Sequence, residues 1–184
     1  MNFRRDAFCS SCGTAFADTQ TYPRHCKSCG LQVWANPIPV SVVLVPIVRE
    51  GKTGLLVVRR GIEPGRGRLA FAGGFLEDHE TWQVGGTREI QEETGVVVDA
   101  STLEPYWYTS TEPRPNRVLL FSVAKPINAE SLDPFKANHE VLERGLVFGP
   151  DGLEELFAFS LHVKAAQRFF RERGIEGRAE YVTC

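Results

Sequence analysis

The sequence has no long apolar run and no marked excess of either charge. No apolar stretch reaches the roughly 18 residues that a membrane-spanning helix needs, and the first residues, MNFRRDAFCSSCG, lack the apolar core of a secretory signal. The 184 residues carry 21 Lys and Arg against 23 Asp and Glu, for a formal charge of −2. We therefore expect a cytoplasmic protein that does not enter a membrane and that recognises phosphate only locally.

The chain also lacks internal repeats and low-complexity segments, and its content of 42% apolar and 24% charged residues is ordinary for a globular protein. Residues 1–36 contain four cysteines, many turn formers and few large aliphatic side chains, whereas β-branched residues dominate from Val40. The prolines of Asn36-Pro-Ile-Pro39 indicate a connector between the two. We predict a small module at 1–36 and a larger domain at 37–184.

Apolar periodicity in the larger domain predicts several strands and two helices. Strands are expected at 40–48, 54–60, 117–126 and 143–150, the last being the final strand, with extended structure at 96–111 and a polar loop at 127–138. One helix is expected from Thr81 to Thr94 with Gly95 as its C-cap, and another at 161–173 with Ser160 as its N-cap. This order predicts a mixed α/β or α+β domain with helices packed on a mixed sheet.

Four of the five cysteines, Cys9, Cys12, Cys26 and Cys29, form two C-x-x-C-G motifs, with 13 residues between Cys12 and Cys26. Each motif predicts a tight turn that aims two thiolates at one point, and two such turns make a closed tetrahedral site suited to structural Zn²⁺. A module of about 30 residues cannot bury enough apolar surface to fold alone, so the metal would supply folding free energy. A redox pair or disulfides are the alternatives.

The cysteine module carries few cations, namely Arg4, Arg5, Arg24 and Lys27. That is a thin basic surface for following a nucleic-acid backbone, so we expect a structural or dimerisation role and a homodimer, with nucleic-acid binding disfavoured. Cys184 is the last residue, and we place it on a frayed tail without a role.

Three carboxylates stand at i, i+3 and i+4 of the predicted helix at 81–94: Glu89, Glu92 and Glu93. This spacing puts them on one helical face, where like charges destabilise the helix by a few tenths of a kcal/mol per pair. A solvated acidic face is one interpretation. Hard oxygen ligands of a single sign that converge in this way also suit Mg²⁺ or Mn²⁺.

The residues around these carboxylates favour the metal site. Gly73-Gly74 opens a loop whose backbone can approach a phosphate or a metal, and Glu80 lies eight residues before Arg88, so that an Arg–Glu pair would lock the loop against the helix. Residues 74–96 match G-x5-E-x7-R-E-U-x-E-E-x-G-U, where U is aliphatic, at every specified position. The segment resembles the Nudix box of the Nudix hydrolases.

The resemblance implies a Nudix α/β/α sandwich over about residues 40–175 and hydrolysis of a nucleotide-type X–diphosphate–Y substrate by water attack on phosphorus. It assigns one to three Mg²⁺ or Mn²⁺ ions to Glu89, Glu92, Glu93 and the Gly73 carbonyl. Arg88 and Glu80 would orient these ligands. The identity of the general base is left open.

A further carboxylate in this family often comes from a later loop. Glu140 fits that position best and Glu143 second, and a surface salt bridge is the alternative for both. Substrate contacts are assigned to Gly73, Gly74, Arg60 of an Arg60-x3-Pro-x2-Gly loop, and Trp107. Trp107 and its two tyrosine neighbours would stack on an adenine or flavin ring, or belong to the core or a subunit interface.

A cysteine ribbon ahead of the box is similar to the NADH pyrophosphatase branch and to a branch that acts on ADP-ribose or FAD. The S-Q-P-W-P-F-P motif of the NADH branch is missing from the corresponding residues, 108–116. NADH is therefore in doubt as the preferred substrate. Removal of a nucleotide cap from RNA is a variant of the same chemistry.

Two glycines, Gly85 and Gly86, lie inside the predicted helix and cost about 2 kcal/mol of helix propensity. Close packing against the sheet would account for them. The opposing functional hypothesis is a non-catalytic module that senses a nucleotide or binds nucleic acid. The complete set of box glutamates counts against it.

Overall fold

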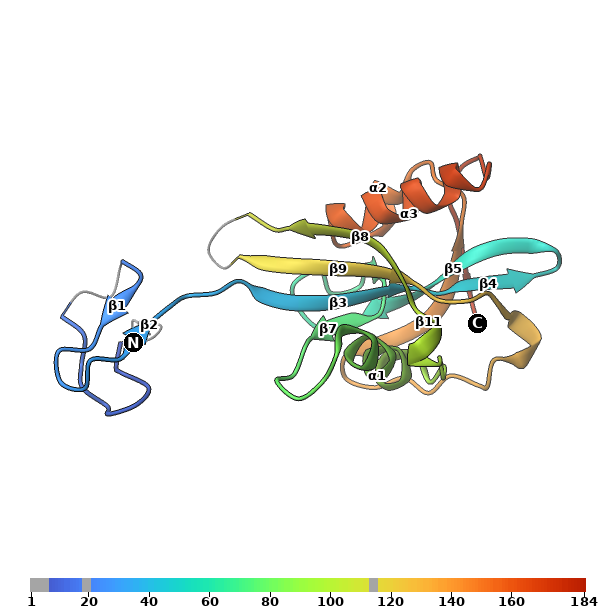
Figure 1. The fold of residues 1–184 in the computed structure, drawn as a ribbon. Helices are drawn as coiled ribbons and strands as arrows, with labels where there is room; N and C mark the ends of the chain where they lie inside the picture. The colour runs from blue at the N-terminus through green and yellow to red at the C-terminus, as the bar shows by residue number, and fades with distance from the viewer. Residues whose placement is uncertain (1–6, 18–20, 113–115) are drawn as a thin grey trace. The chain divides into compact units, whose positions relative to one another are not determined.

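A computed structural model describes residues 7–17, 21–112 and 116–184 (Figure 1). The chain separates into two compact units, Met1–Pro37 and Ile38–Cys184. Arg4, Arg5 and residues 113–115 of the 108–116 segment lie outside the described residues. In the part of the chain that is described, no helix is long and apolar enough to cross a membrane.

The small unit contains one short antiparallel pair, β1 (Arg24–His25) with β2 (Gln32–Val33). Both C-x-x-C-G motifs close with the same hydrogen bond, from the glycine N–H to the carbonyl of the first cysteine, at 2.9 Å for Gly13 and 2.8 Å for Gly30. These glycines have φ of 74° and 75°, a left-handed conformation that L side chains rarely adopt. The repeated motif thus produces two equivalent turns.

The large unit is built on two sheets. The first has the order β7-β3-β9-β8, and the second has the order β10-β4-β5-β11-β12 with β6 paired to β5. The strands of the first are β3 (Ile38–Leu44), β7 (Gly73–Phe75), β8 (Glu104–Ser110) and β9 (Arg117–Val123). Those of the second are β4 (Pro46–Arg49), β5 (Lys52–Arg60), β6 (Leu69–Ala70), β10 (Ile127–Asn128), β11 (Val141–Phe148) and β12 (Glu180–Thr183). The pairs β3–β9 and β10–β4 are parallel and the other pairs are antiparallel, so the predicted mixed pairing is confirmed.

Two long helices, α1 (Trp82–Thr94) and α3 (Ser160–Glu172), lie on opposite sides of the strands (Figure 1). Ile90 of α1 and Phe169 of α3 are fully buried, each in a separate apolar cluster. The short helices are α2 (Leu153–Leu156) and two 3-10 turns, Ala100–Thr102 and Ala129–Ser131. The α+β sandwich predicted from the sequence is confirmed.

The bounds of α1 agree with the sequence prediction because both ends carry specific caps. The Thr81 hydroxyl accepts a hydrogen bond from the N–H of Val84 at 3.4 Å. Gly95 takes the left-handed conformation, with φ of 74°, and donates its N–H to the Gln91 carbonyl. The second helix differs from its prediction, since Ser160 is its first residue and Phe159 is the N-cap, with no side-chain capping bond.

The predicted single strand at 40–48 is wrong, because the run divides into β3 and β4 in different sheets. Leu44 still pairs with β9, whereas Pro46 pairs with Leu55 of β5. At the junction, the Val45 carbonyl already accepts the N–H of Leu56 at 2.9 Å. Both β3 and β4 are largely buried, so their apolar residues form one continuous run. The sequence of this run does not indicate where the chain leaves β9 and begins to pair with β5.

Other differences lie at the edges of the fold. Residues 96–99 belong to no strand, and β10 and a 3-10 turn occupy part of the predicted loop at 127–138. A further strand, β12, follows the one expected to be last. Cys184 is consequently not on a frayed tail, since its N–H donates to the Arg144 carbonyl at 3.0 Å and its side chain packs against buried apolar residues.

Candidate active site

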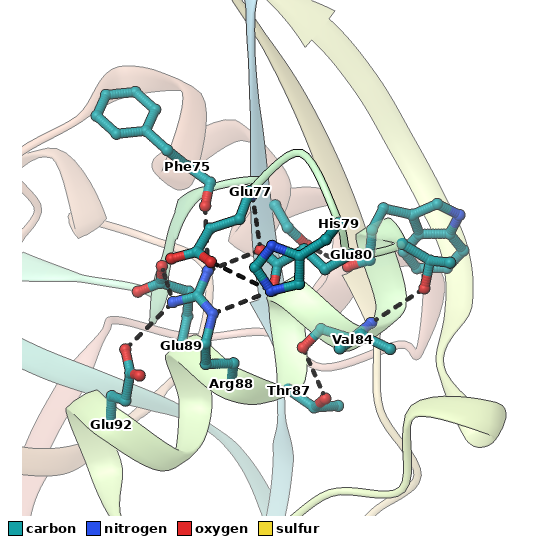
Figure 2. A network of polar contacts seen from close by, with 12 residues as sticks. Phe75, Glu77, His79, Glu80, Val84, Thr87, Arg88, Glu89 and Glu92 are labelled. Atoms are coloured by element: carbon teal, nitrogen blue, oxygen red, sulfur yellow. Dashed lines mark hydrogen bonds and ion pairs between the residues drawn. The ribbon is translucent and has the colours of Figure 1, made fainter.

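Arg88 is the centre of a polar network at the start of α1 (Figure 2). Its Nε and Nη2 donate to the two oxygens of Glu80 at 3.1 and 2.8 Å, and Nη2 also donates to the Phe75 carbonyl at 3.1 Å. Its Nη1 donates to Glu89 at 2.7 Å and to Glu92 at 3.2 Å. The hydrogen bonds from Arg88 lower the pKa of Glu80 to about 2. The expected Arg–Glu pair is present and joins the loop to the helix.

The glycines of this region let backbones approach closely. A Cβ on Gly86 would lie 2.7 Å from Ser41 Oγ and 2.9 Å from Val43 Cγ2, both on β3. A Cβ on Gly85 would lie 2.5 Å from a methyl of Leu76. One on Gly74 would overlap the Glu89 carboxylate. The two helix glycines are therefore required for contact of α1 with β3 and with the loop, which accounts for their cost in helix propensity.

Glu93 faces the strand that precedes the box. One of its carboxylate oxygens accepts the N–H of Gly73 at 3.2 Å. Burial of the carboxyl raises its pKa to about 8, and the negative charges of Glu89 and Glu140 add to the rise. The Gly73 hydrogen bond and the charge of Arg60 act in the opposite direction without cancelling it. The site therefore holds a carboxyl that lacks sufficient positive charge around it.

Glu89 shows the same imbalance. Its side chain is 15% exposed, and burial raises its pKa, with Glu92 and Glu140 contributing further. In the described part of the chain, no three of these carboxylates have oxygen atoms that all lie within 4.8 Å of one another. The sulfur atoms of the four cysteines in the small unit do meet that spacing. Three carboxylates on one helix, one of them buried with a raised pKa, are hard oxygen donors of the kind that a divalent cation such as Mg²⁺ or Mn²⁺ prefers.

Glu140 comes to this cluster from the start of β11. Val141 pairs with Arg60 of β5, and the Gly61 N–H donates to the Glu140 carbonyl at 2.6 Å. A Cβ on Gly61 would overlap the carbonyl of His139, so glycine is needed for this approach. The close approach of Gly61 is a site feature that the sequence pattern did not reveal. The charge of Glu140 makes a small contribution to the raised pKa values of both Glu89 and Glu93.

Glu143, the second candidate of the sequence prediction, is engaged elsewhere. It accepts hydrogen bonds from Arg59 Nε and, at 3.2 Å, from the Tyr181 hydroxyl. The Arg59 hydrogen bond lowers the pKa of Glu143. It is thus part of an ion pair between β5 and β11, the alternative that the sequence left open.

Of the four predicted substrate contacts, the two with side chains, Arg60 and Trp107, differ in position. Arg60 donates to the Pro64 carbonyl at 2.8 Å and lies over the Phe159 ring, and its charge lowers the pKa of Glu93, so it is near the carboxylates. Trp107 lies on β8, which is separated from β7 by β3 and β9. It stacks on Phe121 with ring centroids 5.3 Å apart and lines an open groove of about 420 Å³. The structure does not bring Trp107 to the carboxylates.

The four ribbon cysteines gather tightly, with all sulfur atoms within 4.8 Å of one another. The Cys9–Cys29 and Cys12–Cys26 sulfurs are 3.7 and 3.5 Å apart, near the ~3.8 Å separation of thiolates around a tetrahedral zinc. All four are free thiols, and these distances exceed a disulfide bond of about 2.05 Å. The donor set fits Zn²⁺.

The basic side chain at Arg24 is not available to a partner. It is 5% exposed, donates to the Thr21 carbonyl at 3.0 Å and lies 3.9 Å over the Tyr22 ring. Its role is to pack the small unit. This reduces further the basic surface that the ribbon offers to nucleic acid.

Comparison with known proteins gives consistent matches. The family model for the NUDIX domain matches residues 37–168. The NAD-capped RNA hydrolase NudC of Deinococcus radiodurans is 30% identical over 127 residues, which is 68% of this chain but 44% of that protein's length. The chain thus spans less than half of this relative.

Solved structures share the fold. The NUDIX hydrolase from Nitrosomonas europaea superposes with a TM-score of 0.65 at 23% identity, over 93% of this chain and 95% of that one. The NUDIX domain of Shewanella oneidensis NrtR, solved with ADP ribose, gives a TM-score of 0.61 at 17% identity, over 76% of this chain and 90% of that one.

Proposed function

The chain belongs to the NUDIX domain family, and from this premise we propose that it is a metal-dependent pyrophosphatase that hydrolyses an X–diphosphate–Y substrate by water attack on phosphorus. The observation that carries the proposal is the presence of two buried carboxyls on α1, Glu89 and Glu93, whose pKa values are raised by burial, with Glu140, just before β11, contributing to both. In the described part of the chain Glu93 forms no ion pair, and Glu89 shares the single charge of Arg88 with Glu80 and Glu92, which favours a cation-binding site over a solvated acidic face.

We assign the catalytic metal to Glu89, Glu92, Glu93 and the Gly73 carbonyl. A bound Mg²⁺ or Mn²⁺ would neutralise the diphosphate and lower the pKa of its water. Arg88 and Glu80 orient the ligands through the network described above. Glu140 serves as a further ligand or as the base.

Two positive or donor groups are placed to receive the substrate phosphates. Arg60 lies close enough to Glu93 to influence its pKa, and its guanidinium is held by the Pro64 carbonyl. Gly73 and Gly74 lie against the α1 carboxylates, with the Gly73 N–H donating to Glu93 and the Glu89 carboxylate packed on Gly74. We propose that these residues bind the diphosphate. Trp107 on β8 would contact a ring of the substrate only if the substrate reaches from β7 past β3 and β9.

The substrate class is a dinucleotide or a related nucleoside diphosphate. ADP-ribose, FAD and NADH are the candidates, and a NAD cap on RNA offers the same diphosphate bond. The NAD-capped RNA named for the Deinococcus relative and the ADP ribose named for the NrtR domain support this class. The missing motif at 108–116 favours ADP-ribose or FAD over NADH as the preferred small molecule.

The four cysteines would hold a structural Zn²⁺ in a ribbon domain at 1–36, ahead of a hydrolase domain at 37–184. Free clustered thiols favour a reducing, cytoplasmic setting. We further propose a homodimer, with the ribbon in a structural or dimerisation role.

A substrate panel tests the activity. The purified chain with Mg²⁺ or Mn²⁺ is incubated with ADP-ribose, FAD, NADH and NAD-capped RNA, and products formed in isotopically labelled water are analysed by mass spectrometry. We expect cleavage of the diphosphate with label on a phosphate product. Failure to cleave any member would reject the proposal, and tight binding of ADP-ribose without cleavage would support a nucleotide sensor.

Glu93→Gln is the matching variant. It removes a metal-binding charge while keeping the side-chain size, so turnover should fall by at least about 100-fold with the fold retained. Glu104→Gln, an exposed carboxylate on β8, is the control and should retain full turnover. Equal activity of Glu93→Gln and wild type would contradict the metal assignment.

A further inference from the structure

Arg144 is a buried charge without an ionic partner. It lies in β11 and is 3% exposed. Among the residues that the structure describes, no carboxylate forms an ion pair with it, and its Nε has no hydrogen-bond partner. Burying a guanidinium in this way is unfavourable unless other groups compensate. Its contacts therefore need an explanation.

The guanidinium joins two backbone segments. Its Nη1 donates to the Thr94 carbonyl at 2.9 Å, and its Nη2 donates to the Asp133 carbonyl at 2.7 Å. The plane lies over the ring of Phe135, 5.6 Å from the centroid. Thr94 is the last residue of α1, and Asp133 begins the segment that leads to Glu140. One rigid side chain thus bridges the two elements that carry the carboxylates.

The end of α1 supplies the compensating charge. The last carbonyls of a helix lack partners within the helix and carry a partial negative charge. Helix α1 has no basic residue in its own last turn, and Thr94 itself is fully buried although Gln91, Glu92 and Gly95 around it are exposed. Arg144 provides from β11 both the missing donor and the missing cation.

The segment from Asp133 to Glu140 is otherwise held at its far end. The Asn138 side-chain oxygen accepts the N–H groups of Glu140 and Val141, each at 2.8 Å, and Gly61 donates to the Glu140 carbonyl. These bonds shape the turn that contains Glu140. The Arg144 bond at Asp133 is the one that ties the segment to α1.

We propose that Arg144 is a positioning residue that sets the distance between the α1 carboxylates and Glu140 by clamping both backbones. The proposal rests on the proposed function, in which Glu89, Glu93 and Glu140 act at one centre. Arg144 acts through the Thr94 and Asp133 carbonyls and touches neither substrate nor metal. Its own backbone carbonyl, which accepts from Cys184, is unaffected by a change of side chain.

Two variants separate the clamp from simple packing. Arg144→Met keeps the aliphatic part of the side chain and loses both donors. Arg144→Lys keeps the charge but replaces the planar guanidinium, whose N–H groups point to two acceptors, with one ammonium group. Leu153→Ala is the control, because Leu153 is fully buried in the apolar cluster on the α3 side and contacts none of these residues. If Arg144→Met does not fold, Arg144→Lys carries the test.

Hydrogen exchange of the metal-free full chain is the first measurement. Arg144→Met should accelerate amide exchange in both the last turn of α1 and residues 133–141, and Arg144→Lys should do so less. Leu153→Ala, at a similar loss of thermal stability, should leave these two segments protected. Unchanged exchange in both segments of the arginine variants would overturn the clamp.

The second measurement is the affinity for Mn²⁺, determined by electron paramagnetic resonance. Loss of a residue that supports metal ligands costs on the order of 10-fold or more in affinity. We expect that loss in Arg144→Met, together with a lower kcat at saturating Mn²⁺ and an unchanged KM. Affinity and kcat equal to those of Leu153→Ala would show a packing role only and reject the proposal. If the wild-type protein cleaves no substrate, the proposed function is rejected. Hydrogen exchange and Mn²⁺ affinity still test whether Arg144 holds the two backbone segments together.

Discussion

At the scale of single residues, the decisive feature is a carboxyl whose surroundings oppose its charge. Burial raises the pKa of Glu93 to about 8, while Glu80, bound to the same helix by Arg88, has a pKa of about 2. The two glutamates are indistinguishable by residue type. Their neighbours give Glu80 a fixed partner in Arg88 and leave Glu93 without an ionic partner among the described residues, which is why we propose an orienting role for Glu80 and a ligand role for Glu93.

This difference predicts how stability depends on pH in the metal-free protein. The folded-state pKa of Glu93 is raised, so the carboxyl ionises earlier in the unfolded chain, and the native state loses stability as pH rises from about 4.5 to about 8. Glu93→Gln should remove this loss and give a higher Tm than wild type at pH 9. Thermal denaturation across pH, with chelator present, measures it.

Added Mn²⁺ serves as the control for this prediction. A cation that binds the ionised carboxylate stabilises the native state more strongly at higher pH, so wild type should recover stability at pH 9 while Glu93→Gln should not. An identical pH profile for wild type and variant without metal would show that Glu93 is not buried as described.

At the scale of elements, the sequence of α1 favours close packing on neighbouring elements over intrinsic helix propensity. Gly85 and Gly86 weaken it by about 2 kcal/mol of propensity, yet they allow it to lie directly on β3 and on the loop before it. The caps at Thr81 and Gly95 were readable from the sequence because capping is local. The reason for the two glycines could not be inferred from the sequence, because it depends on Ser41 and Val43, which are more than forty residues away.

Gly86→Ala tests this packing. Alanine improves helix propensity by about 1 kcal/mol, but its Cβ would meet Ser41 Oγ at 2.7 Å and the Val43 methyl at 2.9 Å. We expect a net destabilisation of about 1–3 kcal/mol in urea denaturation, typical of overpacking. Gln91→Ala, at an exposed position of the same helix, should be neutral or stabilising. A more stable Gly86→Ala would show that the glycine has no packing role.

At the scale of the whole molecule, two compact units have different sources of stability. The large unit has buried apolar clusters on both sides of its strands, whereas the small unit contains one two-residue strand pair and a cluster of four thiols. A unit of this size cannot bury enough apolar surface by itself. We therefore expect its folding to depend on metal.

Cys12→Ser should lower the bound zinc and unfold the small unit while the large unit keeps its melting transition. Elemental analysis measures the zinc, and proton NMR of the two units separates local from global unfolding. Cys184→Ser is the matched control, since Cys184 lies outside the cluster and should leave the zinc content unchanged. One equivalent of zinc in Cys12→Ser would contradict the four-thiolate site.

The sequence alone determined what depends on short spacing: the helix that carries three glutamates on one face, its caps, the two cysteine turns and the general order of strands and helices. Each follows from the geometry of a few consecutive residues. The tertiary structure decided which distant groups meet them. It divided one apolar run between two sheets, paired Glu143 with Arg59, placed Trp107 on β8 with β3 and β9 between it and β7, and bound Arg144 to the buried Thr94 carbonyl of α1. These outcomes depend on strand pairing and on compensation of buried charge, which involve residues far apart in the chain and so have no local sequence signal.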